Sequence, residues 1–349
     1  MNSMVRGTNW VGDAVMTIPA LRELRRIFPD SRITLHTRSW AEGIFRDAAF
    51  IDEILTFERE KSTFKTIIKQ AEIWRGKKFD LAVLFPNSFE SALTAKLGKV
   101  PTRFGYAKEG RSFLLTESIE IPDWKNEKHE IFYYLNLAAE VENKYFGTKT
   151  VLDNEPRFEL KVSQTRKAEA RQILTENGVD LSKKIVAFVA GSTNSRAKRW
   201  KAKSFAALND KIQNELNANV ILIGAKDESE VSQEVFEKSL IKPIILTGKT
   251  NLAEATAILS VCDLLISNDT GPAHISAALG TKTLVIFGPT NPKTTQPFHS
   301  EIIRKDVECS PCMLRDCPID HRCMTRISTQ EVFEKAISLI QNSKFKIPD

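Results

Sequence analysis

Residues 264–274 have the sequence LLISNDTGPAH, an apolar run that ends in small polar residues. The run Leu264–Ser267 is typical of a buried parallel strand. A helix is predicted to begin at Pro272, because proline fits the first helical turn, where its missing N–H has no partner to lose. Gly271 lets the backbone come close to a ligand, and the unpaired N–H groups of a helix start attract anions. The stretch therefore predicts either an anion site or an ordinary turn capped by Asp269 or Thr270.

Apolar runs alternate with amphipathic stretches along the chain, which predicts an α/β protein with parallel sheets covered by helices. Helices are expected at Ala14–Phe28 and Phe205–Leu216, where apolar residues recur every three or four positions. The predicted strands are Arg32–Thr37, Leu81–Phe85, Ile185–Val189, Val220–Ile223, Ile244–Leu246, Leu264–Ser267 and Thr283–Phe287.

The length of 349 residues is sufficient for two domains with separate cores. The segment Gly147–Pro156 has little periodicity and carries turn-forming residues at its ends, so we predict domains at 1–156 and 157–349. Each is expected to be a doubly wound, Rossmann-like domain that binds its ligand at the carboxyl ends of the strands. Two such domains facing one another across a cleft would suit an enzyme with two substrates.

The composition is that of a soluble globular protein, with 42% hydrophobic and 27% charged residues. The net charge of +6 fits an anionic partner without identifying it. No apolar run approaches the roughly 18–20 residues that span a bilayer, and the amino-terminal residues lack the pattern of a signal peptide. We therefore expect a cytoplasmic protein, with peripheral contact to a membrane surface as a further possibility.

A glycine-containing loop, GTNWVGD, follows the first short strand and ends at Asp13. Its glycines are five positions apart, so it is not the G-x-G-x-x-G pattern of dinucleotide-binding domains. Asp13 could cap the helix predicted from Ala14, or it could point into the cleft as a general base. Taken alone, the residues favour the cap.

Phosphate binding is predicted after the strand Ile185–Val189. Gly191 and Ser192 could offer backbone N–H groups there, and a basic run follows directly. A basic run is usually a solvated face, but its place after a strand and a Gly-Ser turn favours phosphate binding. The three cations are Arg196, Lys198 and Arg199. After the next strand, Asp227 or Glu228 could accept hydrogen bonds from a ribose.

Six segments in the same order resemble the ADP-heptose:lipopolysaccharide heptosyltransferases, and most closely the heptosyltransferase II group. They are RGTNWVGD at 6–13, PNSF at 86–89, RFGY at 103–106, AKRW at 197–200, SNDTGPAH at 267–274 and FGPT at 287–290. They cover nearly the whole chain. The resemblance implies a GT-B architecture with an N-terminal acceptor domain and a C-terminal donor domain, and a metal-independent reaction that inverts the anomeric centre.

Site residues follow from the resemblance position by position. It assigns the catalytic aspartate to Asp13, against the capping role, and the phosphate-binding lysine to Lys198. His274 completes the donor motif, although a purely local hydrogen bond is an equal alternative. The expected donor contacts are Gly191, Ser192, Lys198, Asp227, Glu228, Asp269, Thr270, Gly271 and His274. The expected acceptor contacts are Asn9, Trp10, Asn87, Lys108 and Arg111, of which Lys108 and Arg111 could instead be solvated loop charges.

Four cysteines lie within fifteen residues, with the spacing C-x2-C-x4-C-x5-C. In a cytosolic chain, four thiols this close favour a tetrahedral zinc site over disulfides, and reduced thiols are the rival interpretation. We expect a local structural zinc at Cys309, Cys312, Cys317 and Cys323 and no metal in the catalytic site. Cys262, which lies alone in an apolar segment, is expected in the core.

The function implied is transfer of L-glycero-D-manno-heptose from ADP-heptose to the lipopolysaccharide inner core, onto the first heptose. The expected partners are ADP-heptose, the lipopolysaccharide acceptor and the inner membrane surface; no nucleic acid partner is expected, and the chain is expected to be a monomer. One alternative is a nucleotide-sugar epimerase of similar two-domain fold, which would act on the donor alone. The other is a non-catalytic nucleotide-binding scaffold, which the presence of Asp13, Lys198 and Asp269 opposes.

Overall fold

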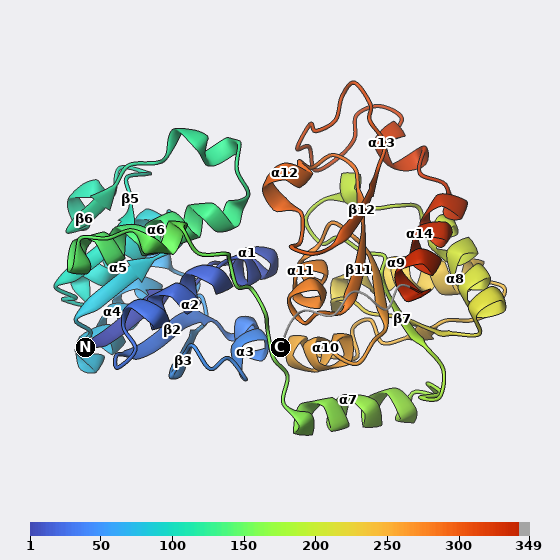
Figure 1. Ribbon diagram of the computed structural model, residues 1–349, viewed down its shortest axis with the longest axis horizontal. Coiled ribbons are helices and arrows are strands. Elements are labelled where there is room, and N and C mark those ends of the chain that lie inside the picture. Colours follow the sequence, from blue (N-terminus) through green and yellow to red (C-terminus); the bar gives the residue numbers. More distant parts are fainter. Residues whose placement is uncertain (342–349) are drawn as a thin grey trace. The chain divides into compact units, whose positions relative to one another are not determined.

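The computed structural model describes residues 1–341 and divides the chain into two compact units, Met1–Phe158 and Glu159–Asp349 (Figure 1). The division falls close to Pro156, where the sequence placed the domain boundary. Within the described residues each unit contains one parallel six-stranded sheet with helices on both faces, so the predicted α/β class is confirmed. Across the same residues, no helix combines the length and the hydropathy that a membrane crossing requires.

The sheet of the first unit has the order β3-β2-β1-β4-β5-β6. Its strands are β1 (Asn2–Arg6), β2 (Arg32–Arg38), β3 (Glu53–Phe57), β4 (Leu81–Leu84), β5 (Thr102–Tyr106) and β6 (Glu117–Ile119). Its helices are α1 (Val11–Met16), α2 (Ile18–Ile27), α3 (Glu42–Phe45), α4 (Thr63–Lys77), α5 (Phe89–Leu97) and α6 (Glu130–Phe146). Helices α4 and α5 pack together over a core that contains Met4, Trp74 and Leu84, and α2 packs against α6.

The helix predicted over Ala14–Phe28 is two helices, α1 and α2, joined at Thr17. Pro19 lies in the first turn of α2 and cannot donate the backbone hydrogen bond that a continuous helix needs there. The Thr17 hydroxyl donates to the Ala14 carbonyl at 2.7 Å, which satisfies one of the carbonyls at the break. The first helix also begins earlier than predicted, at Val11, so Asp13 lies inside it.

The sheet of the second unit has the order β12-β11-β10-β7-β8-β9. Its strands are β7 (Ile185–Val189), β8 (Asn219–Leu222), β9 (Ile244–Ile245), β10 (Leu264–Asn268), β11 (Lys282–Phe287) and β12 (Glu301–Arg304). Its helices are α7 (Gln164–Glu176), α8 (Ala202–Leu216), α9 (Ser229–Lys238), α10 (Leu252–Leu259), α11 (Gly271–Ala278), α12 (Pro292–Thr295), α13 (Arg322–Thr325) and α14 (Thr329–Gln341). Figure 1 shows α8 and α14 on one side of the strands and α10 and α11 on the other.

The core of the second unit is built by strand residues of one parity and the apolar stripe of α8. Phe205, Leu208 and Ile212 of that helix pack on Phe188 and Ile266 of the central strands. The spacing of three and four residues puts the helix side chains on one face, as the sequence predicted. The part of α14 that the structure describes adds Val332, Phe333, Ala336 and Leu339 to the same cluster.

In both sheets, the order in which the chain adds strands reverses at the central pair. In the first unit the chain runs outward from β1 to β3 and returns to place β4 on the other side of β1; in the second unit the same happens at β7 and β10. Loops that leave the carboxyl ends of the two central strands diverge there and open a crevice, which is where such sheets bind ligands. The residues that follow these four strands are therefore the first place to search for a site.

The expected zinc site at Cys309, Cys312, Cys317 and Cys323 is not supported. Among residues 1–341, no group of three or more His, Cys, Asp or Glu side chains is placed to hold a metal ion. Cys323 is buried in the core of the second unit, whereas Cys309 and Cys312 are exposed. Burial raises the pKa of the Cys323 thiol, and Cys309, Cys317 and Cys312 lie near enough to raise it further, but the four thiols are not placed as metal ligands. Cys262 is buried, as predicted.

The residues after Cys317 dock on the end of β11 through Gly288. A Cβ at this position would collide with Met324, which is fully buried, and would lie 3.3 Å from the Cys323 sulfur. The close approach of α13 to the strand therefore requires a residue without a side chain at 288.

We expect Gly288→Ala to lower the free energy of unfolding by about 1–3 kcal/mol, because the added methyl overpacks a filled core. Urea unfolding of the whole chain measures the effect. Gly76→Ala in α4 is the matched control: nothing lies within 4 Å of its added Cβ, so the better helix propensity of alanine should raise stability by up to about 1 kcal/mol. Equal stability of Gly288→Ala and the native chain would contradict the packing argument.

Candidate active site

Lys198 is held between the ends of neighbouring strands in the second unit. It lies in the 3-10 turn η5 (Arg196–Lys198) after β7, and its Nζ is 2.8 Å from Oδ2 of Asp269, the residue after β10. The same oxygen accepts a 2.7 Å hydrogen bond from the hydroxyl of Thr290, beyond the end of β11. Asp269 is buried and the lysine side chain is partly exposed, so the pair fixes a cation at the carboxyl edge of the sheet.

Asn268, the last residue of β10, ties the loop after β7 to that strand. Its side-chain amide donates to the carbonyls of Ala190, at 2.8 Å, and Gly191, at 3.2 Å, and its oxygen accepts from the Trp200 N–H at 3.0 Å. Both ends of the loop that carries Lys198 are thus bonded to one buried side chain. The sequence analysis assigned no role to Asn268 or Thr290. Their positions at the ends of adjacent strands are the signal that could have found them.

The ordinary capped turn at the start of α11 is excluded. Thr270 is the residue before the helix, but its side chain makes no cap hydrogen bond; its hydroxyl lies 2.9 Å from that of Ser267 instead. The Asp269 carboxylate binds Lys198 and Thr290 and does not cap the helix. The helix begins at Gly271. Pro272 has no N–H, and the Ala273 N–H donates to the Thr270 carbonyl at 3.2 Å, so the first turn leaves the Gly271 N–H for a ligand. This N–H follows Asp269 by two residues, which makes the turn suitable for an anion. His274 is buried in the same turn.

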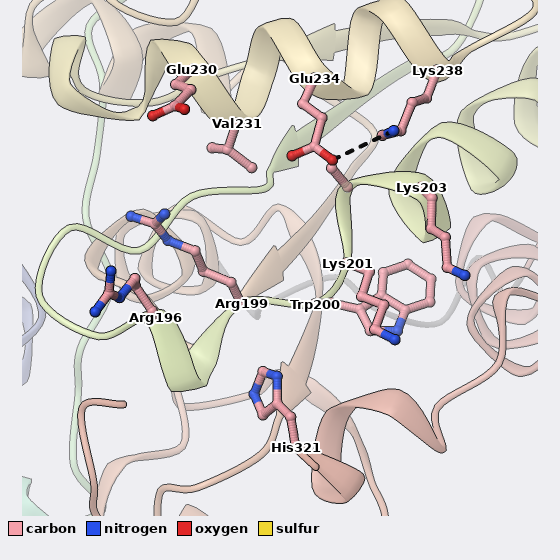
Figure 2. Close-up of a pocket in the computed structure, with 11 residues that line it drawn as sticks. Arg196, Arg199, Trp200, Lys201, Lys203, Glu230, Val231, Glu234, Lys238 and His321 are labelled. Carbon is pink, nitrogen blue, oxygen red and sulfur yellow. Dashed lines mark ion pairs between the residues drawn. The ribbon is translucent and has the colours of Figure 1, made fainter. Parts of the chain in front are cut away.

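The three cations of the basic run do not converge, contrary to expectation. Arg199 donates twice to the carbonyl of Ser192, at 3.2 and 3.0 Å, and Arg196 pairs with Asp316 at 2.6 Å. Both arginines line a separate pocket of about 560 Å³. Figure 2 shows them across from the α9 side chains of Glu230 and Glu234. The side chains drawn around it include Trp200, Lys201, Lys203, Glu230, Glu234, Lys238 and His321. Lys198 is not among its lining residues, so only Lys198 joins Asp269.

The cysteine-rich segment, residues 309–323, contacts the loop that carries Lys198. The carbonyl of Arg315 accepts from the Ala197 N–H at 2.9 Å and from the Ser195 hydroxyl at 3.2 Å. The His321 ring nitrogen Nε2 lies 2.5 Å from the Ala197 carbonyl. The segment therefore braces the turn immediately before the lysine, and this contact is its visible structural role.

Glu228 and Asp227 lie in different surroundings, which separates the two ribose candidates. Glu228 is buried, rests against the α-carbons of Gly191 and Gly224, and accepts a 2.9 Å hydrogen bond from the Ala225 N–H. Burial raises the pKa of this carboxyl, and the nearby Asp227 adds to the effect. Asp227 is exposed. The charge of Arg199 and a hydrogen bond from the Thr193 side chain act in the opposite direction. A carboxyl has several acceptor positions, and ribose hydroxyls are suitable additional donors.

Asp13 is not a helix cap. The residue before α1 is Trp10, and Asp13 is the third residue of the helix, where its side chain is partly exposed. It lies near the phenol of Tyr134, whose pKa is raised chiefly by burial and further by the charge of Asp13. Asn9 and Trp10 are exposed beside it, and Trp10 retains 56% of its surface. The loop after β1 therefore presents an aromatic ring, an amide and a carboxylate together.

Arg111 lies inside the first unit. It is fully buried, and its guanidinium donates to the carbonyls of Pro86, Ser88 and Tyr106. This burial contradicts both earlier interpretations, an acceptor contact and a solvated charge, because the loop folds the side chain back under the end of β4. Lys108 of the same loop is exposed.

Asn87, which follows β4, is hydrogen-bonded to two buried side chains, Tyr133 and Arg111. Its amide donates to the Tyr133 hydroxyl at 3.1 Å, and its oxygen lies 3.4 Å from an Arg111 nitrogen. It is partly exposed. Arg111 thus positions a candidate acceptor contact without being one.

A family model described as glycosyltransferase family 9 (heptosyltransferase) matches residues 68–322. The chain belongs to this family. Lipooligosaccharide heptosyltransferase 2 of Campylobacter jejuni is 28% identical over 98% of the chain and 99% of the relative. Lipopolysaccharide heptosyltransferase 2 of Escherichia coli is 26% identical over 97% and 99%. The predicted family is confirmed, and with it the prediction of a glycosyltransferase.

Solved structures confirm the GT-B fold class. The structure of E. coli ADP-heptose lps heptosyltransferase II matches with a TM-score of 0.83 at 24% identity, covering 97% of this chain and 98% of that one. A family 9 glycosyltransferase from Veillonella parvula matches with a TM-score of 0.84 at 22% identity, covering 97% of both chains. The likeness extends through both units, so neither sheet is an addition to the family 9 fold.

The raised pKa of Glu228 predicts a pH-dependent stability. The folded state holds this proton more tightly than the unfolded chain, so the contribution is complete below the ordinary glutamate pKa and is lost as the pH rises through the folded-state value. Glu228→Gln removes this loss. We therefore expect the variant to gain stability relative to the native chain as the pH rises above the ordinary glutamate pKa, as measured by urea unfolding.

Glu230→Gln, at an exposed position of α9, is the control and should follow the pH dependence of the native chain. A Glu228→Gln variant that also follows the native curve would show that the buried carboxyl carries no such cost.

Proposed function

We propose that this family 9 enzyme transfers L-glycero-D-manno-heptose from ADP-heptose to the lipopolysaccharide inner core, onto the first heptose, with inversion and without a metal. The observation that carries the proposal is the position of Lys198, fixed 2.8 Å from Asp269 beside the uncapped start of α11. A cation and the Gly271 N–H at one switch point suit a diphosphate. The relatives' names supply the sugar and the acceptor class.

The donor would bind with its diphosphate at this turn and its ribose at Glu228. Gly191 and Ser192 would line the approach from the end of β7, and Thr270, Gly271 and His274 would complete the diphosphate site. Lys198 would balance the charge that develops as the bond between the anomeric carbon and the diphosphate breaks. Electrostatic stabilisation of a leaving group is strongest where the cation is already held in place, and Asp269 holds this one.

Asp13 would act as the general base. A hydroxyl of the acceptor attacks the anomeric carbon, its proton passes to the Asp13 carboxylate, and ADP leaves from the opposite side. The location of Asp13 supports this role, because the carboxylate lies beyond β1 at the switch point of the first sheet and is partly exposed. The exposed ring of Trp10 would lie against a sugar face of the acceptor, with Asn9, Asn87 and Lys108 supplying polar contacts.

The acceptor is part of a lipid-linked glycan, so we further propose a cytoplasmic enzyme that meets the inner membrane surface peripherally and acts as a monomer. Transfer assays with ADP-heptose and truncated lipopolysaccharide cores of defined length test the acceptor. Incubation with ADP-heptose alone should leave the sugar unchanged. A changed sugar without acceptor would indicate the epimerase alternative.

We expect Asp13→Asn to reduce kcat by roughly 10²–10⁴-fold while ADP affinity stays within a few-fold of native, because the amide cannot accept the proton. Single-turnover transfer and calorimetric ADP binding measure the two quantities. The exposed Asp123→Asn of the same unit is the control, with activity unchanged. Near-native turnover by Asp13→Asn would remove Asp13 as the base.

Lys198→Met should weaken ADP binding by about 10–100-fold, since a charged hydrogen bond to phosphate contributes about 1.5–3 kcal/mol. Lys203→Met, an exposed lysine of the same unit without an ion pair in the described residues, should bind ADP normally. Thermal unfolding of both variants separates lost binding from lost folding. Unchanged ADP affinity in a folded Lys198→Met variant would contradict the phosphate role.

A further inference from the structure

Arg6 is a buried cation at the carboxyl edge of the first sheet. It is the last residue of β1, it pairs in register with His36 of β2, and only 4% of it is exposed. Its guanidinium lies 3.9 Å from the centre of the Phe57 ring and donates to the His36 carbonyl at 3.2 Å. No carboxylate forms an ion pair with it among residues 1–341. Buried arginines are rarely left without an anionic partner.

His36 adds a second donor without an acceptor. Its Nδ1 accepts a 2.9 Å hydrogen bond from the Trp74 indole, and burial together with the charge of Arg6 holds its pKa well below the usual range. The neutral ring therefore carries its proton on Nε2. That nitrogen is buried and has no hydrogen-bond partner. The residue pair thus offers several N–H groups, of which one Arg6 N–H donates to the His36 carbonyl and the His36 Nε2–H has no acceptor in the described part of the chain.

Two further arginines end the neighbouring strands. Arg38 closes β2 on the same face as His36 and lies 5.4 Å from the Phe57 ring, and Arg59 follows β3. Burial lowers the pKa of Arg6 to about 9, and the charges of Arg38 and Arg59 act in the same direction, against Glu90. Arg6, Arg38 and Arg59 face two carboxylates here, Glu58 and Glu90, so the edge has an excess of positive charge.

The carboxylates near this edge bind the outer arginines, not Arg6. Glu58 lies 3.4 Å from Arg38, and Glu90 lies 3.0 Å from Arg59. The Glu58 side chain is 67% exposed, and an exposed pair of this kind contributes little to stability. A stronger oxyanion could therefore displace Glu58 from Arg38 at small cost and reach the donors behind it.

We propose that Arg6, His36 and Arg38 form a subsite for an oxyanion, a phosphate or carboxylate group carried by the acceptor. The subsite rests on the proposed function for its occupant. It lies on the α4 face of the sheet, at the end of β1 that leads into the loop with Asn9, Trp10 and Asp13. An acceptor bound at that loop would then be recognised both by its reacting sugar and by an anionic group beside it.

Arg6→Met tests the subsite, with Arg38→Met as a second variant at a less buried position. Arg32→Met is the matched control, because it makes the same charge change at the opposite end of β2. We expect Arg6→Met to raise the KM for the acceptor by about 10–100-fold with kcat changed less than about threefold, since charged hydrogen bonds are lost from binding alone. Its Tm should equal or exceed the native value, because an unpaired buried charge is removed.

Inorganic phosphate is the direct probe. With ADP saturating the donor site, phosphate should raise the Tm of the native chain and of Arg32→Met but not that of Arg6→Met or Arg38→Met. This measurement needs no transfer activity, so it stands even if the proposed reaction fails. In transfer assays phosphate should compete with the acceptor, and only where Arg6 is present.

Three results would overturn the subsite. One is a native Tm that phosphate leaves unchanged. Another is an Arg6→Met variant that loses stability but keeps the native acceptor KM, which would make Arg6 structural. The third is phosphate binding that depends on Arg6 yet does not compete with the acceptor, which would mean that the ion is free and not carried by the acceptor. Absence of heptosyl transfer by the native chain would instead count against the proposed function.

Discussion

The pairing of β7 with β10 is the constraint on which the rest of the second unit depends. These strands are adjacent in the sheet and far apart in the chain, so their following loops diverge at one edge. Asn268 closes that edge by bonding to the backbone at both ends of the loop after β7. This holds Lys198 beside Asp269, which follows β10 and is itself hydrogen-bonded to Thr290 beyond β11. The cation is placed by backbone topology first and by its own ion pair second.

The same geometry recurs in the first unit at β1 and β4, with different side chains. Asp13 and Asn87 follow those strands, and neither is fully buried. Arg111 fills the space beneath Asn87 and satisfies carbonyls that the end of β4 leaves without strand partners. At its switch point one unit thus presents a carboxylate and an amide, and the other presents a cation and a backbone N–H. This difference supports the proposed acceptor and donor roles of the two halves.

The central strands of both sheets could be predicted because burial on both faces leaves near-continuous apolar runs. β7 coincides with its prediction, and β2, β4, β8, β9, β10 and β11 differ from theirs by one or two residues. The strands β3, β5, β6 and β12 were not predicted. Three of these are edge strands, which are half exposed, and Glu53, Glu117 and Glu301 begin them. Mixed polarity removes the signal that an apolar run gives.

Site residues were predictable where a strand end and a motif coincide, as at Lys198 and Asp269. Side-chain direction was not. Arg196, Lys198 and Arg199 are close in sequence, yet a 3-10 turn sends them to different partners. Nor does sequence reveal that Arg111 is buried, since a basic loop residue and a structural arginine have the same local pattern. The cysteines illustrate the same point, because their spacing suggests a metal site while the described residues 1–341 place no three of them as metal ligands.

Glu228 occupies space that exists only because residues 191 and 224 lack side chains. The identities of these three positions are therefore coupled. A methyl group introduced at Gly191 meets the carboxylate, but the same methyl would find room if residue 228 were shortened beforehand. The order in which such changes accumulate decides whether each is tolerated, so an acidic residue at 228 restricts which sequences are open to the loop after β7.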